Sequence, residues 1–531
     1  MRIKVKTIVL IGFLLLVQQI SSQVLTEETI KIGRTLSLID TWYVDTTDIT
    51  QLTENMIIDL LKKLDPHSTY ISAKDVKDMN EPLLGNFEGI GIQFNILHDT
   101  ILVVEPISGG PSEKVGLRAG DRIITINSEK VTGIGISTTG VRGRLMGPKG
   151  TSVTINIFRR GVKDILDFTI IRDKIPINSL DAAYMLDSET GYVKLNKFAA
   201  TTDKEFETAL SALSQSNVKN LIIDLRGNGG GYMNAATDMA GKFFQGQNLL
   251  VYLIGRKNPR QDFKSPGRGK LSSARVVVLT DEGSASASEI FAGAMQDWDR
   301  GVVIGRRTFG KGLVQNGFWL SDGSMIRLTI ARYYTPTGRL IQSPYNEGYD
   351  KYIENYYKRY SDGEMLTADS VHFPDSLRFR TLINKRIVYG GGGIMPDVFV
   401  PVDTSNYSDY YRALVRRGVF NSYILEYADK YRDRIKKEYS SFDDFKARFR
   451  FAESEIQDFI NKGNEAGVKY NEVQYRISQK EILMVLKALV ASNIWQTNEY
   501  YRIVNEDDVV IAEALKIISD KEVYNKILGY K

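Results

Sequence analysis

Hydrophobic and polar residues follow different patterns in successive parts of the chain. Between Glu27 and Leu84 apolar residues recur at helical spacing, which predicts a small helical unit. From Gly85 to about Asp173 short β-forming runs are punctuated by Gly and Pro, which predicts a β-rich domain. From Ile175 to Pro401 strand and helix patterns alternate, which predicts an α/β core. Beyond Pro401 the pattern is helical.

The predicted core contains continuous apolar runs, which are typical of strands buried on both faces of a sheet. A polar, tyrosine-rich stretch from 345 to 360 predicts an insertion at the surface, near 345–385. The expected strands are 191–198, 221–225, 275–280, 302–305 and 324–334, and the expected helices are 202–216 and 234–244.

The region after Pro401 contains two capping-box spacings, Ser441 with Asp444 and Ser478 with Glu481, and each predicts the start of a helix. No chemical motif is visible there. We therefore expect a packing or assembly role, with a homodimer or adaptor contact through this region as the alternative.

The N-terminus has the layout of a secretory signal peptide. Arg2, Lys4 and Lys6 precede an uncharged apolar run from Ile8 to Val17. This run is about half as long as a helix that crosses a bilayer, so a cleaved signal over 1–22 is favoured over a retained anchor. We expect an exported protein of the periplasm or cell envelope.

Length and composition indicate a multidomain globular protein. A chain of 531 residues is too long for one compact core and suggests about three or four folding units. The net charge of +5 comes with no long single-sign run, which gives no support to nucleic-acid binding. The absence of cysteine excludes disulfides, a thiol nucleophile and thiolate metal sites. The expected division is 1–22, 23–84, 85–173, 174–401 and 402–531.

Three alternate serines, Ser284, Ser286 and Ser288, follow a predicted buried strand and open a predicted helix. A serine at such a turn exposes its hydroxyl at the carboxyl edge of a sheet, close to a helix N-terminus that stabilises developing negative charge. A serine at a helix start can also be a simple N-cap. The spacing alone does not choose among the three.

A serine hydroxyl needs a base. The only histidines, His67, His98 and His372, lie in three separate segments away from these motifs, and we expect His67 and His98 to be structural or surface residues. Lys311 is the candidate base, because its flanking glycines and Phe309 allow close approach and desolvation. Burial disfavours the ammonium form, so more of the lysine is present near neutral pH as the neutral amine, which can accept a proton.

A glycine run follows the predicted strand that ends at Asp224. Consecutive glycines leave backbone N–H groups free to point at a substrate oxyanion. A phosphate-binding loop is the alternative, but the segment lacks the Gly-Lys-Ser/Thr ending, and it also lacks the dinucleotide spacing.

The motifs together resemble the carboxyl-terminal processing protease family, also called tail-specific proteases, over most of the chain. The β-rich segment is similar to a PDZ domain, through its Gly89-Ile90-Gly91-Ile92 turn and the later Ala119–Ile123 stretch. The family resemblance is carried by Leu64–Ser68, Phe87–Gly91, Asp224–Gly231, Ser284–Ile290, Phe309–Gly312, Gln315 and Gly392–Asp397.

The resemblance implies a multidomain α+β protein whose α/β protease core is of the crotonase or ClpP type. It makes Ser286 the nucleophile, Lys311, which lies 25 residues later, the base, and Gln315 the residue that orients the lysine. It also suggests the amides of Gly230 and Ala287 as oxyanion donors, with Gly231 as the adjacent alternative. Asp297 aligns with an aspartate important in some members, and we expect it to be structural. No metal or cofactor is implied.

The implied function is a serine endopeptidase that cuts proteins at or near their C-termini. In the PDZ domain, Gly89, Ile90, Gly91 and Ile92 are expected to bind the substrate tail, which we expect to be apolar. One alternative is a catalytically silent PDZ scaffold, which would not need the nucleophile and its base. Another is a Ser–Lys hydrolase of non-peptide esters or amides, against which the PDZ resemblance argues.

Overall fold

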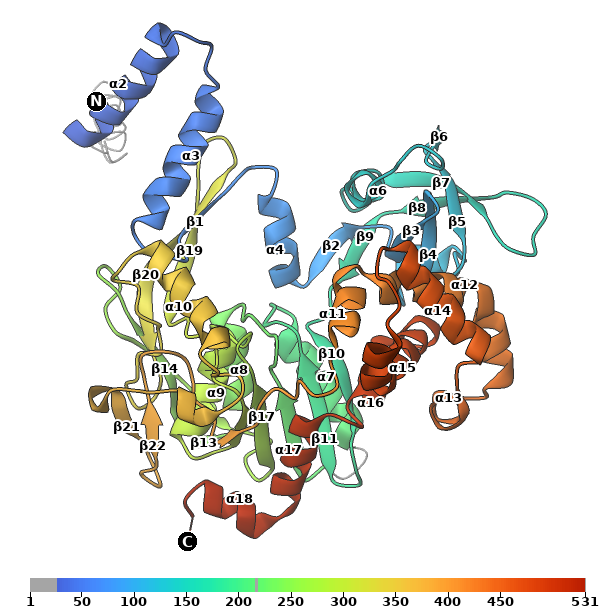
Figure 1. Ribbon diagram of the computed structural model, residues 1–531. Coiled ribbons are helices and arrows are strands. Elements are labelled where there is room, and N and C mark those ends of the chain that lie inside the picture. Colours follow the sequence, from blue (N-terminus) through green and yellow to red (C-terminus); the bar gives the residue numbers. More distant parts are fainter. Residues whose placement is uncertain (1–25, 215–217, 531) are drawn as a thin grey trace, which may run out of the picture.

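The computed structural model describes residues 26–214 and 218–530, so the predicted signal peptide lies outside the described residues. Figure 1 shows a projecting N-terminal helical hairpin, a β-rich domain, a mixed core, and C-terminal helices that reach from the β-rich domain to the core. Within the described ranges, no helix has the length and apolar character needed to cross a membrane.

The N-terminal helical region consists of α2 (Glu27–Trp42), α3 (Ile49–Lys62) and α4 (Val76–Leu84). Helix α2 buries none of its side chains. Between α3 and α4 the chain adds a short strand, β1 (Thr69–Ile71), to a sheet of the core. The N-terminal region is therefore attached to the core through this strand.

The main core sheet has the strand order β10-β11-β12-β17-β18-β23. Its neighbours from β11 to β23 are parallel, and β10 is an antiparallel edge strand. The predicted core strands and helices are present, with ends that differ by no more than three residues, except that the predicted helix end at 216 lies outside the described residues. The strands are β10 (Leu180–Met185), β11 (Thr190–Leu195), β12 (Asn220–Asp224), β17 (Arg275–Thr280), β18 (Val302–Gly305) and β23 (Val398–Phe399).

Helices cover both faces of this sheet. One face packs against α7 (Thr202–Ser214), α8 (Met233–Gly241) and α9 (Ala287–Asp297). Every residue of α9 is buried. The other face packs against the last two helices of the chain, α17 (Val509–Ser519) and α18 (Lys521–Ile527). The C-terminal end is thus part of the core.

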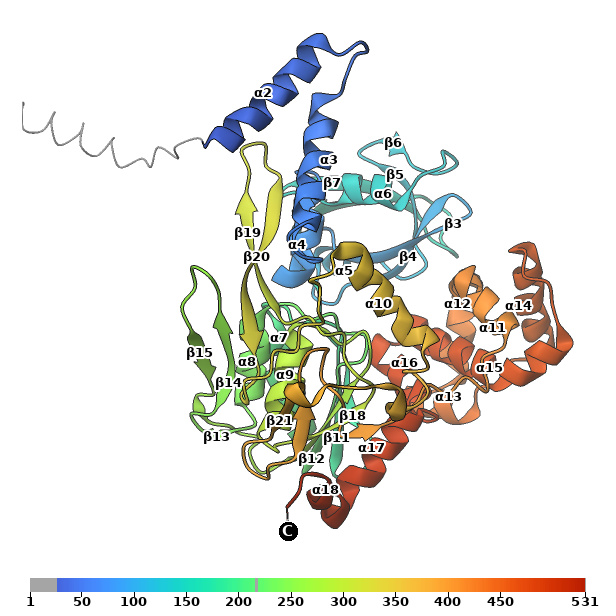
Figure 2. The same cartoon turned by 60° about the vertical axis from the view of Figure 1, so that its left-hand side comes forward.

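A second, antiparallel sheet stands beside the first one. It has the order β1-β20-β14-β15, and β19 also pairs with β20 (Figure 2). Its other strands are β14 (Leu249–Ile254), β15 (Gln261–Lys264), β19 (Leu313–Trp319) and β20 (Met325–Tyr334). The core also contains helix α10 (Tyr349–Ser361) and two small pairs of strands, β13 (Gln245–Gly246) with β16 (Gly267–Arg268) and β21 (Arg378–Arg380) with β22 (Ile387–Tyr389).

The β-rich domain is an antiparallel sheet of order β3-β4-β5-β7-β8, with β6 paired to β5. Strand β3 lies at its edge. The pair β2–β9 lies where the chain enters and leaves this domain. The elements are β2 (Asn86–Gly89), β3 (Ile92–Leu97), β4 (Thr100–Pro106), α5 (Pro111–Lys114), β5 (Arg122–Ile126), β6 (Glu129–Lys130), α6 (Thr138–Leu145), β7 (Ser152–Phe158), β8 (Leu166–Ile171) and β9 (Asp173–Pro176).

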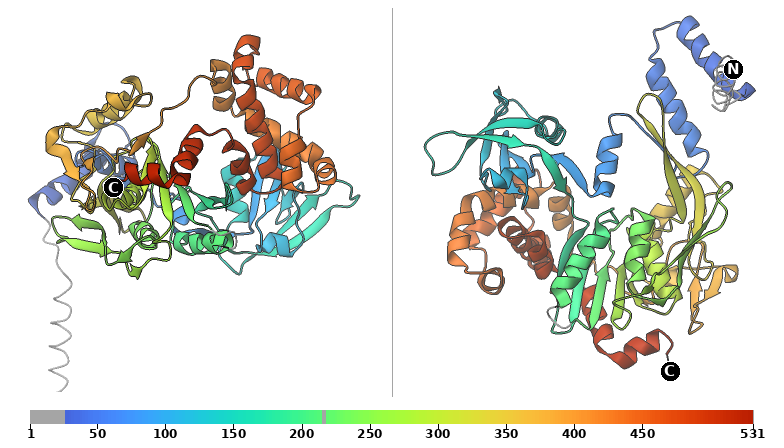
Figure 3. Two further views of the ribbon diagram at one scale, coloured as in Figure 1. Left: turned by 90° about the horizontal axis from the view of Figure 1, so that it is seen from below. Right: turned by 180° about the vertical axis from the view of Figure 1, so that it is seen from behind.

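The C-terminal helices hold the β-rich domain and the core together (Figure 3). On α12, Asp429 accepts hydrogen bonds from Arg122 at 2.7 Å and from Arg160 at 3.1 Å, both in the β-rich domain. On α16, Tyr501 donates to Asp181 of β10 at 3.0 Å. These helices are α11 (Asp409–Arg416), α12 (Val419–Glu438), α13 (Phe442–Arg448), α14 (Glu453–Glu465), α15 (Glu472–Ile494) and α16 (Thr497–Val504).

One of the two predicted helix starts in this region is wrong. Ser441 caps α13 and accepts the Asp444 N–H at 3.2 Å, as predicted. Ser478 lies inside α15, and its buried hydroxyl donates to Ser408 at 2.9 Å. The helix begins after Asn471, because that side chain supplies the cap and the apolar stripe continues through Ser478.

The packing of α17 on the sheet yields a stability prediction with a matched control on the same helix. Val510 is 4% exposed, whereas its neighbour Val509 is 48% exposed. We expect Val510→Ala to lower the free energy of unfolding by about 2 kcal/mol, because it removes buried methyl groups and leaves a cavity. Urea unfolding followed by tryptophan fluorescence measures this change. Val509→Ala should be close to neutral, and equal effects of the two substitutions would contradict the packing.

Candidate active site

The structure separates the three serines of the turn between β17 and α9. The hydroxyl of Ser284 donates to the Leu225 carbonyl at 2.8 Å, and that of Ser288 donates to the Asn228 carbonyl at 2.8 Å. Both are fully buried. Ser286 alone of the three lines a cleft. Its backbone has φ 55° and ψ −112°, a strained conformation for a residue with a side chain and one that is frequent at functional sites.

The cleft beside Ser286 has a volume of about 690 Å³ and brings together the residues proposed for catalysis. Ser286, Lys311 and Gln315 all line it. The remaining lining residues are Asn80, Leu83, Gly229, Gly230, Gly231, Tyr232, Met233, Asn234, Ala287, Ile290, Leu313, Val314, Asn316, Gly317, Met325, Arg327 and Tyr333.

Lys311 is partly buried at the wall of the cleft, and its side chain is held by a neutral amide. Its Nζ donates to Gln315 Oε1 at 3.0 Å, and Gln315 Nε2 in turn donates to the His67 carbonyl at 2.6 Å. Burial lowers the pKa of Lys311, and the nearby Arg327 cation lowers it further, against the opposing charges of Asp65 and Glu289. The arrangement therefore favours a neutral amine whose position is fixed by a neutral amide.

The buried carboxylate of Glu289 connects the serine turn to the lysine loop. One oxygen accepts the N–H groups of Ser286 at 2.8 Å and Lys311 at 2.9 Å. The other oxygen accepts the Thr308 hydroxyl at 2.6 Å and the Gly310 N–H at 2.8 Å. Burial raises the pKa of Glu289, although these four hydrogen bonds oppose the shift. The Ser-x-x-Glu spacing of Ser286 and Glu289 is a capping-box pattern and accounts for the bond to the Ser286 N–H, but no sequence pattern indicates the bonds to the lysine loop.

The glycine-rich loop lies directly against Ser286. A Cβ on Gly230 would be 2.8 Å from the Ser286 Cβ, and a Cβ on Gly231 would be 2.0 Å from the Phe198 carbonyl oxygen. The Gly230 N–H already donates to Asn228 Oδ1 at 2.9 Å. Among the hydrogen bonds of residues 26–214 and 218–530, none uses the N–H of Gly231 or Ala287. Of the three candidate oxyanion donors, these two are thus available in this conformation.

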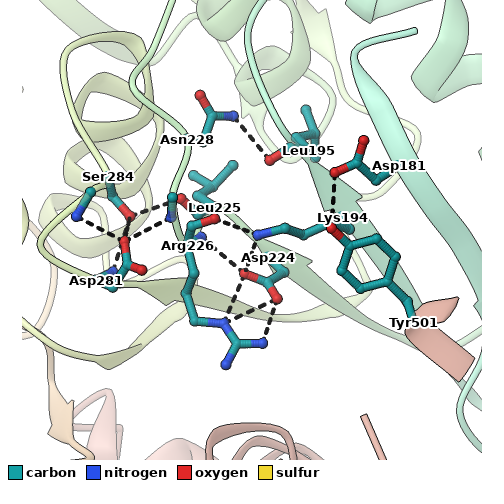
Figure 4. A network of polar contacts seen from close by, with 12 residues as sticks. Asp181, Lys194, Leu195, Asp224, Leu225, Arg226, Asn228, Asp281, Ser284 and Tyr501 are labelled. Carbon is teal, nitrogen blue, oxygen red and sulfur yellow. Dashed lines mark hydrogen bonds and ion pairs between the residues drawn. The ribbon is translucent and has the colours of Figure 1, made fainter. Parts of the chain in front are cut away.

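A buried network of charged residues lies next to the start of the glycine-rich loop (Figure 4). Asp224 accepts hydrogen bonds from Tyr192 at 2.8 Å, Lys194 at 3.2 Å and Arg226 at 2.6 Å. Burial by itself would raise the pKa of Asp224, but the cations of Arg226 and Lys194 hold it well below its usual range. Arg226 also donates to Asp508, the cap of α17, at 2.8 Å. The C-terminal helices therefore help to fix this loop.

His67, which we expected to be a structural or surface residue, is packed against the lysine loop without lining the cleft. Its ring lies 6.1 Å from that of Phe309, and its Nε2 is 3.1 Å from the Tyr352 hydroxyl. Burial lowers the pKa of His67 to about 4, so it is neutral at neutral pH. The Leu64–Ser68 motif was the only sequence signal for this contact.

Helix α10 lies within the predicted surface insertion and is buried on one face. Tyr357 and Tyr360 on its outer face are 65% and 48% exposed, as expected for a surface segment. Tyr352 is only 5% exposed, and the Tyr356 ring lies 5.1 Å from that of Phe309. The helix is amphipathic, and its inner face covers the lysine loop.

Asp297 lies at the end of α9 and is fully buried. It forms an ion pair with Arg339, which is also fully buried, and accepts the Thr337 hydroxyl at 2.7 Å. It does not line the cleft. These contacts give Asp297 a structural role in joining α9 to the segment after β20.

A second cavity, of about 460 Å³, lies between edge strand β3 and helix α6 of the β-rich domain and helix α4 of the N-terminal region. Ile90, Gly91 and Ile92 line it, whereas Gly89 is buried at the end of β2 and pairs with Asp173. The other lining residues are Asp78, Glu81, Pro82, Phe87, Gln93, Phe94, Thr138, Arg142, Leu145, Met146 and Ile177. An open strand edge beside an apolar groove suits the addition of a peptide strand.

Comparisons with known proteins agree with the motifs. Residues 189–348 match the model of peptidase family S41, residues 89–170 match that of the PDZ domain, and residues 410–496 match a family of unknown function. The chain is 36% identical to a carboxy-terminal-processing protease of Bartonella bacilliformis over 59% of this chain and 72% of that protein. It is 33% identical to carboxy-terminal processing protease CtpA of Bacillus subtilis over 64% and 72%.

Among solved structures, the photosystem II D1 C-terminal processing protease is 29% identical with a TM-score of 0.33, over 59% of this chain and 90% of that one. The two family models and the two curated relatives confirm the resemblance and the multidomain α+β fold class inferred from the sequence.

The role of Glu289 can be tested by replacing its carboxylate with an amide. In Glu289→Gln the amide nitrogen faces two of the four donors, so two buried groups lose their acceptor. We expect the free energy of unfolding to fall by about 3 kcal/mol, and labelling of Ser286 by a serine-directed fluorophosphonate to slow. The control is Glu472→Gln, at a side chain that is 62% exposed. Unchanged stability and labelling in Glu289→Gln would contradict this role.

Proposed function

The chain belongs to peptidase family S41, the carboxy-terminal processing proteases, and from this premise we propose how its residues perform the reaction. It is a serine endopeptidase with a PDZ domain. The observation that carries the proposal is that one cleft contains the strained Ser286 and the partly buried Lys311, whose backbones are joined through Glu289.

In the proposed mechanism, neutral Lys311 removes the proton of the Ser286 hydroxyl while Oγ attacks the peptide carbonyl. Gln315 holds the amine in place through its side-chain oxygen. The oxyanion is stabilised by the N–H of Ala287, at the start of α9, and by the glycine-rich loop, where we favour Gly231 over Gly230. Lys311 then protonates the leaving amine, and water releases the acyl-enzyme with Lys311 again acting as the base.

For substrate recognition we propose that the C-terminal tail of a protein adds as a strand beside β3. Between β3 and α6 the groove has apolar side chains that include Ile92, Phe94 and Leu145, which suit an apolar tail, and the charged Asp78, Glu81 and Arg142 also line it. Peptide or protein substrates are implied by the protease and PDZ matches themselves. The tail would anchor the substrate while an upstream segment enters the catalytic cleft.

We also propose that the protein is exported to the periplasm or cell envelope, on the basis of the basic and apolar pattern over 1–22. Sequencing the N-terminus of the protein recovered from cells tests this, and a retained N-terminal run would oppose it.

Dimer formation or adaptor binding through 402–531 stays a prediction. In the structure, residues of this region contact the PDZ domain and core of the same chain.

The nucleophile and base are tested with an unstructured protein that carries or lacks an apolar C-terminal tail. Wild type is expected to cut, and Ser286→Ala and Lys311→Ala are expected to lose at least about 10³-fold in kcat. Matched controls are Ser211→Ala and Lys204→Ala, at exposed positions. Cleavage by Ser286→Ala would refute the nucleophile. Binding of tailed peptides without cleavage by wild type would favour the silent scaffold, and hydrolysis of esters alone would favour the non-peptide hydrolase.

The protonation state of Lys311 predicts the pH dependence of the reaction. Burial and Arg327 lower its pKa, so the neutral base forms below the ordinary lysine value of about 10.4. For a substrate without titrating groups, we expect kcat/KM to rise with pH and then reach a plateau. The midpoint of this rise should lie below the ordinary lysine value. Initial rates across the pH range measure this midpoint. A midpoint at or above the ordinary value would contradict catalysis by a buried lysine.

A further inference from the structure

The lining of the catalytic cleft has an uneven distribution of charge. It contains two basic side chains, Lys311 and Arg327, and no carboxylate. Glu289 is fully buried and does not line the cleft, and its two oxygens already accept four hydrogen bonds. A neutral Lys311 would leave Arg327 as the charged group that faces a substrate in the cleft.

Arg327 is placed on the cleft wall by strand β20. Alternate residues of a strand share one face, and Met325, Arg327 and Tyr333 of this strand all line the cleft. Tyr333 marks the catalytic end of this face, because its hydroxyl donates to the carbonyl oxygens of Ser286 at 3.0 Å and Lys311 at 2.6 Å. Opposite Arg327 on β19 is Gly317, which has no side chain to cover the guanidinium.

Arg327 differs from the neighbouring arginines of the core in its partners. Arg306 pairs with Glu282 at 2.8 Å, and Arg307 and Arg339 pair with Glu364 and Asp297. Over residues 26–214 and 218–530 no ion pair or side-chain hydrogen bond involves the Arg327 guanidinium, although the residue is half-buried. A guanidinium has a planar fork of donors that matches a carboxylate, and partial desolvation strengthens such a contact.

We propose that Arg327 is a specificity-determining residue that binds a carboxylate of the substrate in the catalytic cleft. This inference rests on the proposed function, since it names a substrate feature that the same cleft selects. Two sources supply a carboxylate, an acidic side chain or a free C-terminus. The acidic side chain is favoured, because the PDZ groove is the proposed site of the terminal residues.

The test uses pairs of peptides that carry Glu or Gln at single positions on either side of one cleavage site. Wild type is expected to prefer Glu at one position by about 10-fold to 100-fold in kcat/KM, the range of a charge-assisted hydrogen bond. Arg327→Gln should lose this preference, and Arg327→Lys should keep part of it. The matched control is Arg332→Gln, because Arg332 is an exposed residue of the same strand that does not line the cleft.

Two further measurements separate recognition from a structural role. Binding of the same peptides to Ser286→Ala, with and without Arg327→Gln, should show the same Glu preference in Kd. Arg327→Gln should also raise the pH midpoint of kcat/KM, because it removes a cation that lowers the pKa of Lys311. The other charged groups that act on Lys311, Asp65 and Glu289, are unchanged in this variant.

Each outcome decides the proposal. Equal cleavage and binding of Glu and Gln peptides by wild type overturn it, while the protease function stands. A preference that survives in Arg327→Gln also overturns it. If short peptides with a free C-terminus are preferred over their amides in an Arg327-dependent way, the terminal carboxylate is the group bound. If wild type cuts no peptide and Ser286→Ala binds none, the proposed function and this inference fail together.

Discussion

The active site depends on one buried carboxylate. Glu289 accepts hydrogen bonds from the backbone on both sides of the catalytic pair, at Ser286 and at Lys311. An isolated buried charge would be too costly, but charge-assisted hydrogen bonds from four donors stabilise it. The serine turn has a strained backbone, and this strain persists only because the surroundings over-determine it. Glu289 provides that constraint and sets the position of the lysine loop at the same time.

Segments from the two ends of the chain complete the same centre. The carbonyl of His67, between α3 and β1, fixes the amide of Gln315, which in turn holds Lys311. Asp508, which caps α17, pairs with Arg226 at the start of the glycine-rich loop. Because α17 also covers one face of the main sheet, the C-terminal region is a structural part of the protease core.

The chemistry of the site was more predictable than its connections. Strand and helix periodicity located the core elements, and the family motifs pointed to Ser286 and Lys311. Periodicity could not choose among Ser284, Ser286 and Ser288. The choice depends on which hydroxyls donate to backbone carbonyls of the loop before α8, and these long-range bonds leave no local pattern.

Long-range contacts were the least predictable feature. The contact between His67 and Gln315 joins residues 248 positions apart, and no local pattern encodes it. The start of α15 was misplaced for the opposite reason, because a good local cap at Ser478 was overridden by an apolar stripe that continues through it.

The choice of Gln315 as the partner of Lys311 follows from the electrostatics of a partly buried lysine. A carboxylate at this position would orient the amine equally well, but it would stabilise the ammonium and raise the pKa of the base. A neutral amide orients Nζ without that penalty, while burial and Arg327 keep the pKa low. The charge of the substrate would also affect the pKa of Lys311. A carboxylate bound at Arg327 would offset the positive charge that helps to lower this pKa.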